Sequence, residues 1–236
     1  MPRFLVFDLA AQIASFGDLA GHERRGGDTW PGRSALIGLI AGALGTRRKD
    51  AAGQARLHSL AFAVAAHEVG QPLRDYHTVQ SVPSTIKRPA TRAEALRRGA
   101  AERRLSTSIT RRDYRAGVRH TVAAWGRRDS EIDLRAVGAA LERPRFVPYL
   151  GRKACPLSMP MAPVVIEADD PLAALRAPRA MHRPPPLFVA TEYFEGVEAR
   201  GGSVLWRHDD PRDRTRWHFG ARPVHVLRGD AMGWEP

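Results

Sequence analysis

Cysteine and long apolar runs are scarce in this sequence, and each shortage excludes a class of protein. The one cysteine, Cys155, cannot form an internal disulfide framework or a cysteine-based metal cluster. No segment reaches the roughly 20 consecutive apolar residues that cross a membrane. The apolar run near the N-terminus is too short for a signal peptide. We therefore expect a cytoplasmic protein that no segment anchors to a membrane.

Sequence motifs for common cofactors are also missing. The chain has no Walker-type phosphate loop, no GxGxxG after its first apolar run, no HExxH and no paired cysteines. Its nine histidines are scattered and do not show the spacing of metal ligands. We therefore predict no cofactor and no metal site.

Positive charge is present in excess. The formal net charge is +12, from 34 Arg, 3 Lys and 25 acidic residues. A GC-rich genome explains the preference for Arg over Lys, but it does not explain the net surplus. Such a surplus indicates a polyanionic partner, with nucleic acid as the first candidate. Arginine suits that role because its planar fork binds phosphate bidentately and stacks on bases.

More than half of the surplus lies in one segment. Residues 87–115 hold ten basic and three acidic residues, a net +7 in 29 residues. The surrounding stretch is polar and contains Pro72, Pro83 and Pro89. We predict that residues 71–116 form an insertion that projects from the core, with a hairpin as one possible form, and we name this segment the thumb. Arg111 and Arg112 are its candidate phosphate-binding residues.

The apolar pattern outside the thumb predicts four strands and two helices. In the first half we expect a strand at residues 3–9, a long loop at 14–32, a helix that Ser34 caps and Gly45 ends, and a strand at 59–69. In the second half we expect the following elements: a half-buried strand at 118–125, a helix at 131–141 capped by Ser130, and a strand at 163–168.

This order of elements is the ferredoxin-like split pattern that RNA-recognition (RRM-type) domains share. We therefore predict an α+β fold with a core of residues 1–70 and 117–168, the inserted basic thumb, and a small C-terminal β appendage at residues 169–236. Three apolar runs separated by charged or Gly-rich turns indicate the strands of this last region.

The segment FVPYLGRKACP at residues 146–156 is the sharpest local feature. Gly151 lets the backbone approach a ligand closely, Arg152 and Lys153 can bind phosphate, and Tyr149 can stack on a base. The segment can equally be an ordinary helix-to-strand loop with a packed tyrosine. Its spacing does not decide between the two interpretations.

Two further groups of basic residues are candidates for phosphate binding. Arg33 is electrostatically unfavourable at a helix start unless an anion binds there too, so Arg33 with Ser34 is a candidate phosphate site. Arg24 and Arg25 lie in the expected loop, where a solvated surface is the simpler interpretation.

Arg74, Tyr76 and His77 combine a cation, an aromatic ring and a titratable ring. A Tyr–His pair beside phosphate can act as acid and base in RNA cleavage through the 2′-hydroxyl. Consecutive residues of an extended chain point to opposite sides, however. Stacking or hydrogen bonding without chemistry is therefore the leading interpretation, and we predict no catalytic residue.

Several stretches of this sequence resemble one known family. They are RFLVFDLAAQIASFG, PGRSALIGLIAGALG, LRDYHTV, PRFVPYLGRKACPLSMP and DDPLAAL, and together they span most of residues 3–175. The chain resembles the CasD family, the subunit that binds the 5′ handle of the crRNA in the type I-E CRISPR Cascade complex. Gly32 departs from the family pattern, which has Thr before the Arg-Ser pair.

The resemblance implies a non-catalytic RNA-binding subunit of an antiviral ribonucleoprotein complex. It implies contacts with the crRNA 5′ handle, the backbone subunits and the large subunit, and only indirect contact with target DNA, which guide pairing selects. It also implies that the thumb passes between the handle and the first guide segment. Two alternatives stay open: a metal-independent endoribonuclease that processes CRISPR repeat RNA through Tyr76 and His77, and a generic RNA-binding module that works alone.

Overall fold

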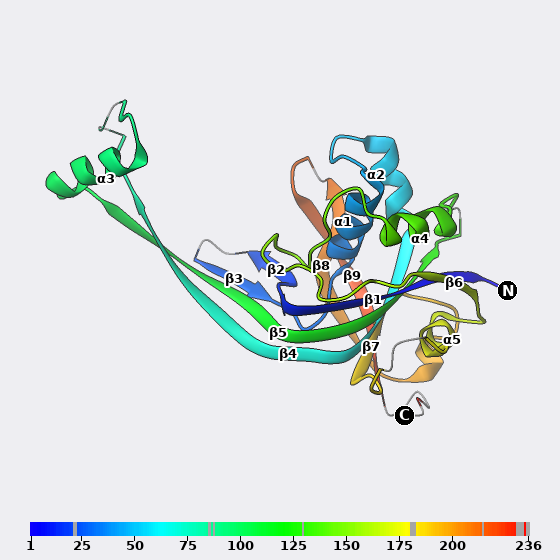
Figure 1. Cartoon of the computed structure of the whole chain (residues 1–236). Coiled ribbons are helices and arrows are strands. Elements are labelled where there is room, and N and C mark those ends of the chain that lie inside the picture. Colours follow the sequence, from blue (N-terminus) through cyan, green and yellow to red (C-terminus); the bar gives the residue numbers. More distant parts are fainter. Residues whose placement is uncertain are drawn as a thin grey trace.

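A largely antiparallel sheet runs through the whole molecule in this computed structural model, and helices cover both of its faces (Figure 1). The structure describes residues 1–20, 23–84, 86, 88–128, 130–179, 183–213, 215–229 and 234. Its strands are β1 (Arg3–Ala14), β2 (Gly17–Ala20), β3 (Arg24–Gly27), β4 (Leu60–Ser81), β5 (Ser106–Gly126), β6 (Val164–Glu167), β7 (Phe188–Thr191), β8 (Ser203–Asp213) and β9 (His218–Arg228). Its α-helices are α1 (Arg33–Leu44), α2 (Ala51–His58), α3 (Arg92–Ala101), α4 (Leu134–Glu142) and α5 (Pro171–Arg176). The protein is thus a mixed α/β protein.

The central strands lie in the order β6, β1, β5, β4, and each neighbouring pair is antiparallel. Strand β7 pairs with the other edge of β4, and β9 and β8 follow it. The C-terminal strands therefore continue the central sheet. The expectation of a small β appendage did not include this pairing, because no local pattern shows that residues 188–191 align with Ala63 to Ala66 of β4.

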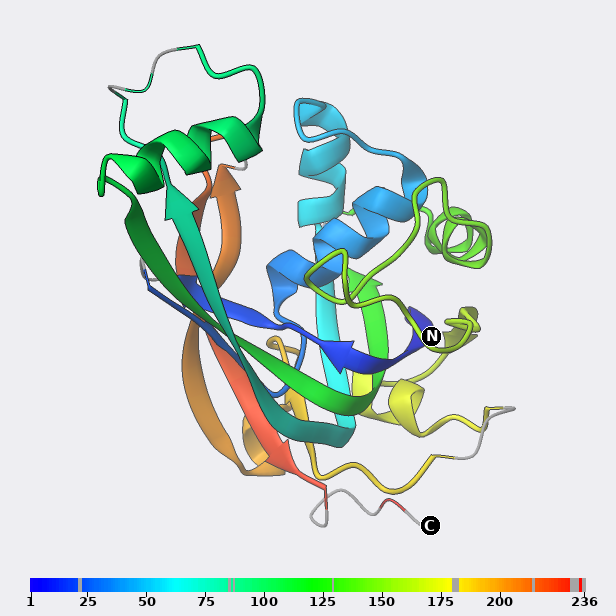
Figure 2. The same ribbon diagram turned by 60° about the vertical axis from the view of Figure 1, so that its left-hand side comes forward.

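Two hydrophobic clusters lie on opposite faces of this sheet. Alternate residues of β1 divide between them: Leu5 and Phe7 belong to the cluster that contains α1 and α4, and Phe4 and Val6 to the cluster that contains α5. Figures 1 and 2 show α1, α2 and α4 together on one side and α5 on the other. Strand β5 is consequently buried on both faces at residues 120–124, so the prediction of a half-buried strand is wrong there.

The predicted long loop at residues 14–32 is also wrong, because β2 and β3 lie within it. Strand β3 has the sequence RRGG and no apolar pattern, but it pairs in parallel with β5. The predicted N-cap of the second helix, α4, is wrong as well, because Asp133, and not Ser130, accepts the hydrogen bond from the Arg135 amide. Gly45 ends α1 in the left-handed conformation, as predicted.

The thumb is a long hairpin of β4 and β5 that leaves the body of the molecule and ends in α3 (Figure 1). Gly70 and Gly117 lie opposite each other where it departs, and both have positive φ. At the tip, Ile86 and Ala95 are buried, so α3 packs on a small apolar cluster of its own. Lys87, which belongs to the predicted basic segment, lies outside the described residues.

Among the described helices, none is long and apolar enough to cross a membrane. The same residues contain no group of three or more His, Cys, Asp or Glu side chains arranged to hold a metal ion.

Candidate nucleic-acid interface

Strand β3 and the thumb strand β5 sort the predicted arginines onto two faces. Arg25 pairs in register with Arg112, and Arg24 pairs with Arg111. Side chains of register partners share a face, and successive residues of a strand alternate between faces. Arg25 and Arg112 therefore lie on one face of this strand pair, and Arg24 and Arg111 lie on the other.

The face with Arg25 and Arg112 is turned toward the loop of residues 146–156. Tyr114 follows Arg112 by two residues and shares its face, and the Arg152 guanidinium lies over the Tyr114 ring at 4.5 Å from its centroid. Arg25, Arg152 and Lys153 all line one pocket. Basic residues far apart in the sequence thus meet at one place.

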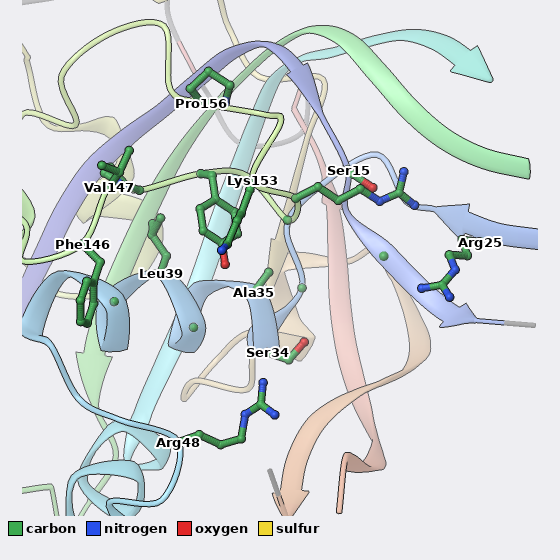
Figure 3. Close-up of a pocket in the computed structure, with 18 of the residues that line it drawn as sticks. Ser15, Arg25, Ser34, Ala35, Leu39, Arg48, Phe146, Val147, Lys153 and Pro156 are labelled. Carbon is green, nitrogen blue, oxygen red and sulfur yellow. The ribbon is translucent and has the colours of Figure 1, made fainter. Parts of the chain in front are cut away.

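This pocket has a volume of about 980 Å³ and four walls. They are α1 with Arg48 just after it, the 146–156 loop, the middle of β3 beside Ser15 and Gly17, and the β8–β9 turn with the start of β9. Figure 3 shows Ser34 and Ala35 on the helix, Lys153 facing them, and Arg25 and Arg48 entering from other sides. Of the predicted residues, the following line the pocket: Arg25, Ser34, Tyr149, Gly151, Arg152 and Lys153.

The pocket is suited to an anion. Four cations line it, Arg25, Arg48, Arg152 and Lys153, and none of the described lining residues is acidic. A group of cations that no lining carboxylate neutralises attracts a phosphate group.

The 146–156 loop is fixed to the end of β1 by backbone contacts. The Ser15 amide donates to the Leu150 carbonyl at 3.0 Å, and the Leu150 amide donates to the Cys155 carbonyl at 2.8 Å. Gly151 has φ +87°, and a Cβ atom there would lie 1.7 Å from the Ser15 carbonyl oxygen. Gly151 therefore permits a close approach of the chain's own backbone. It also lines the pocket, and its close approach to a ligand stays a prediction.

Cys155 lies inside this loop and is fully buried. Burial raises the pKa of its thiol, so the side chain stays protonated and packs as a small apolar group. It has no part in the chemistry of the pocket.

The opposite face of the thumb base carries a smaller basic cluster. Arg74 Nε donates to Asp113 Oδ1 at 2.7 Å, and Arg24 Nη2 lies 3.4 Å from Asp113 Oδ2. The Arg74 hydrogen bond is the main cause that holds the pKa of the Asp113 carboxyl below its usual range. Tyr76 and Arg111 are register partners on this face. Asp113 is shared by two arginines, so the cluster keeps a positive surplus.

Tyr76 and His77 are not brought together as an acid–base pair. Tyr76 pairs with Arg111 and His77 with Thr110, so the two side chains lie on opposite faces of the hairpin. His77 Nδ1 is 2.8 Å from Asp75 Oδ2, on its own face. The geometry agrees with the expectation that the two rings stack or hydrogen-bond separately.

The predicted phosphate site at Arg33 is contradicted. The Arg33 side chain is 1% exposed, and its guanidinium donates to Glu192 at 2.8 Å and to Asp210 at 3.1 Å. It also donates to the carbonyl oxygens of Leu60 and His58, at 2.6 Å each. All of these partners belong to the chain itself, so the side chain is not available to a ligand.

The helix start is occupied by a carboxylate of the chain itself. Gly32 is the N-cap residue and makes no side-chain cap, which contradicts the prediction that Ser34 caps the helix. The Arg33 amide instead donates to Asp209 Oδ2 at 2.8 Å. A Cβ atom on Gly32 would lie 2.4 Å from that oxygen, so the absence of a side chain at residue 32 admits the Asp209 carboxylate.

Sequence reasoning missed several residues of the pocket. Arg48, Trp217 and Phe219 all line it. Arg48 follows α1 closely in a basic turn, which was a usable signal. The contribution of Trp217 and Phe219 depends on the β8–β9 turn reaching the pocket, and no local pattern reveals that.

Comparisons with known proteins agree on one family. A family model described as CRISPR-associated protein (Cas_Cas5) matches residues 4–225. The chain is 32% identical over 239 residues to the CRISPR system Cascade subunit CasD of Escherichia coli (strain K12), covering 97% of each protein.

Two solved structures are similar over nearly the whole chain. One, from a CRISPR RNA-guided surveillance complex, has 27% sequence identity and a TM-score of 0.63, with coverage of 96% of this chain and 90% of that one. The other, the crystal structure of a Cas protein, has 22% identity and a TM-score of 0.59 with 99% coverage of both chains, and it supports the fold alone.

Proposed function

The chain belongs to the CRISPR-associated protein (Cas_Cas5) family, and on that basis we propose that it is an RNA-binding subunit of a CRISPR surveillance complex that holds the 5′ handle of the crRNA. One observation carries the proposal: four cations from three separate segments line a pocket whose described lining holds no acidic residue. A relative named as a Cascade subunit and a similar structure from an RNA-guided complex support the assembly context.

Binding in this pocket depends mainly on phosphate contacts. Arg25, Arg152 and Lys153 neutralise phosphates in the pocket, and Tyr149 supports a base at the rim. Arg112, on the same strand face as Arg25, neutralises a phosphate beside it. Single-stranded RNA held in this way binds with an affinity that falls steeply with salt, because phosphate neutralisation releases counterions.

The order of elements supports the finer description of the core as a ferredoxin-like, RRM-type domain. The strand order β6, β1, β5, β4, with α1 and α4 on one face, is that of the split β-α-β-β-α-β unit. In RRM domains bases stack on the open sheet face. Here α5 packs on that face, so we place the RNA at the edge of the sheet, beside α1.

The hairpin form of residues 71–116 supports their assignment as a thumb that inserts along the crRNA. Its base contacts a pocket residue through Tyr114, whose ring lies against the Arg152 guanidinium, and its far end carries α3. The proposed partners are the crRNA 5′ handle and the backbone and large subunits, with target DNA reached only through the guide. The core of residues 1–70 and 117–168 and the C-terminal region of 169–236 complete the proposed division of the chain.

We propose that the protein does not cut RNA. The separation of Tyr76 and His77 onto opposite faces supports this and disfavours the endoribonuclease alternative. Incubation of the full chain with CRISPR repeat RNA in chelator tests it: the RNA should stay intact. A product with a cyclic phosphate end would overturn the proposal.

The binding function is tested by the affinity of the full chain for repeat-derived single-stranded RNA in a series of salt concentrations. We expect Arg152→Ala to weaken binding and to reduce the salt dependence. Arg135→Ala, on the exposed side of α4 and away from the pocket, is the matched control and should match the wild type. Equal affinity and equal salt dependence in both variants would exclude Arg152 from the RNA site.

A further inference from the structure

We propose that Trp217 is a stacking platform for one nucleobase at the rim of this pocket. The inference rests on the proposed function, because it requires RNA in the pocket. It adds a specific contact from the β8–β9 ribbon, the region farthest in sequence from the other walls.

The backbone and exposure of Trp217 indicate that its ring serves a ligand. Trp217 lies in the turn between β8 and β9 with φ +54°, a conformation uncommon for a bulky residue. Its side chain adds little to the core, because the residue is 54% exposed. Trp30, by contrast, is 8% exposed and packs on Phe188 with ring centroids 5.2 Å apart. Strained backbone that presents an exposed aromatic ring is typical of ligand contacts.

An arginine side chain covers one face of the Trp217 ring. The Arg48 guanidinium lies over it, 4.1 Å from the ring centroid. Phe219 lies 6.1 Å away at a tilted angle. Arg48 covers one face of the indole and more than half of the residue is exposed, so we place the base on the other face. A base stacked there would complete a sandwich of guanidinium, indole and base.

Hydrogen bonds of β8 hold the ribbon that carries Trp217 in place. Asp209 of β8 accepts from the Arg33 amide at 2.8 Å and from both Arg222 Nε and Nη2, at 2.6 and 3.0 Å. Asp210 binds the Arg33 side chain. These buried contacts tie the ribbon to the start of α1, so the position of the Trp217 ring relative to the pocket is built into the fold.

The side chains around the Trp217 ring favour a nucleotide as the ligand. A flat apolar ring next to Arg48 and within the same pocket as Lys153 and Arg25 matches a ligand that joins a flat base to an anionic backbone. Aromatic stacking of this kind tolerates every base, because each has a π face. We therefore expect a contribution to affinity with little sequence preference.

The test compares Trp217→Ala, Trp217→Phe and Trp206→Ala in the full chain. Trp206 is the control because it is 68% exposed on the same ribbon and does not line the pocket. The probe is a fluorescent single-stranded repeat-derived RNA, together with a series in which each position in turn is abasic. We expect Trp217→Ala to weaken binding by about 5-fold to 100-fold, the range for loss of one stacked base. Trp217→Phe should keep most of the affinity, and Trp206→Ala should match the wild type.

The abasic series assigns the effect to stacking. One abasic position should weaken wild-type binding and leave Trp217→Ala unchanged, since the partner base is already lost. If Trp217→Ala weakens natural and abasic RNA equally at every position, the ring acts through structure and the inference is overturned. If Trp217→Ala binds like the wild type while Arg152→Ala binds weakly, the inference fails and the proposed function stands. If the wild type binds no RNA, the proposed function itself fails.

Discussion

The body of the molecule and the thumb use arginine in opposite ways. In the body, Arg33 is buried, and all three nitrogens of its guanidinium donate hydrogen bonds to carboxylate or carbonyl oxygens of the chain. At the thumb base, Arg111 and Arg112 lie in register with Arg24 and Arg25, so like charges face each other across the strand pair.

This difference shows that the place of a charge, more than the number of charges, identifies a polyanion site. Like charges directly opposite each other destabilise a strand pair, and a bound phosphate chain would relieve that repulsion. The paired arginines of the body have no such requirement. Part of the basic residues behind the net charge of +12 is therefore structural, and composition alone does not separate that part from the rest.

The largest expected effect comes from removing the buried Arg33 side chain in the body. Arg33→Ala leaves Glu192, Asp210 and two carbonyl oxygens without their shared partner. Removing one member of a buried ion-pair network costs about 3 to 5 kcal/mol, so the free energy of unfolding in urea should fall by that amount. Arg111→Ala, in the exposed thumb, should change it by less than about 0.5 kcal/mol. Equal effects of the two variants would contradict the division between body and thumb.

A glycine pair sharpens the same comparison. Gly151 in the body and Gly117 at the point where the thumb departs have similar φ, +87° and +75°. A Cβ atom at Gly151 would meet the Ser15 carbonyl, whereas a Cβ atom at Gly117 would meet open space. Gly117→Ala should therefore cost only the backbone strain, about 1 to 2 kcal/mol. Gly151→Ala should cost about 2 to 4 kcal/mol, since overpacking adds to it. Unfolding in urea measures both, and a smaller cost at Gly151 would contradict the described contact.

Acid should weaken the body through His120. Burial, with a smaller contribution from the charge of His67, lowers the pKa of this fully buried histidine to about 3, from an ordinary value of 6.5. The unfolded chain then binds a proton that the folded chain does not. The free energy of unfolding is therefore undiminished by this group above pH 6.5, and it decreases as the pH falls toward 3. Between pH 7 and pH 5 the wild type should lose about 2 kcal/mol more stability than His120→Leu. Parallel losses in the two proteins would show that His120 titrates normally.

The smallest expected effect comes from removing the Arg112 side chain in the thumb. Arg112→Ala should leave the free energy of unfolding nearly unchanged and weaken RNA binding several-fold. Because one phosphate contact is lost, the slope of log affinity against log salt should become shallower by about 0.7. Arg135→Ala controls for the loss of one unit of charge. An unchanged slope would place Arg112 outside the RNA path.

The core of this fold was predictable because its signals are local. Apolar runs revealed the strands β1, β4, β5 and β6, and the helical period revealed α1 and α4, so the order of the central elements follows from the sequence. Strand β3 escaped because nothing in RRGG favours a strand, and its partner on β5 is more than 80 residues away. Helix α2 escaped because only Gly53 and Leu57 of its residues are buried.

The candidate site was predictable where one segment carries it. The PYLGRKACP stretch indicated Tyr149, Arg152 and Lys153, and all three line the pocket. Arg33 was misassigned because its partners Glu192 and Asp210 are supplied by the distant C-terminal region. Trp217 was missed for the same reason, since only the folded ribbon brings it to the rim.

The most direct test of the central claim is ultraviolet cross-linking of crRNA in the assembled complex, followed by mass spectrometry of the peptides of this chain. The pocket account predicts cross-links from the 5′ handle to the peptide that contains residues 146–156, and to the β3 peptide that contains Arg25. Handle cross-links confined to the α5 side of the sheet, with none on these two peptides, would contradict it.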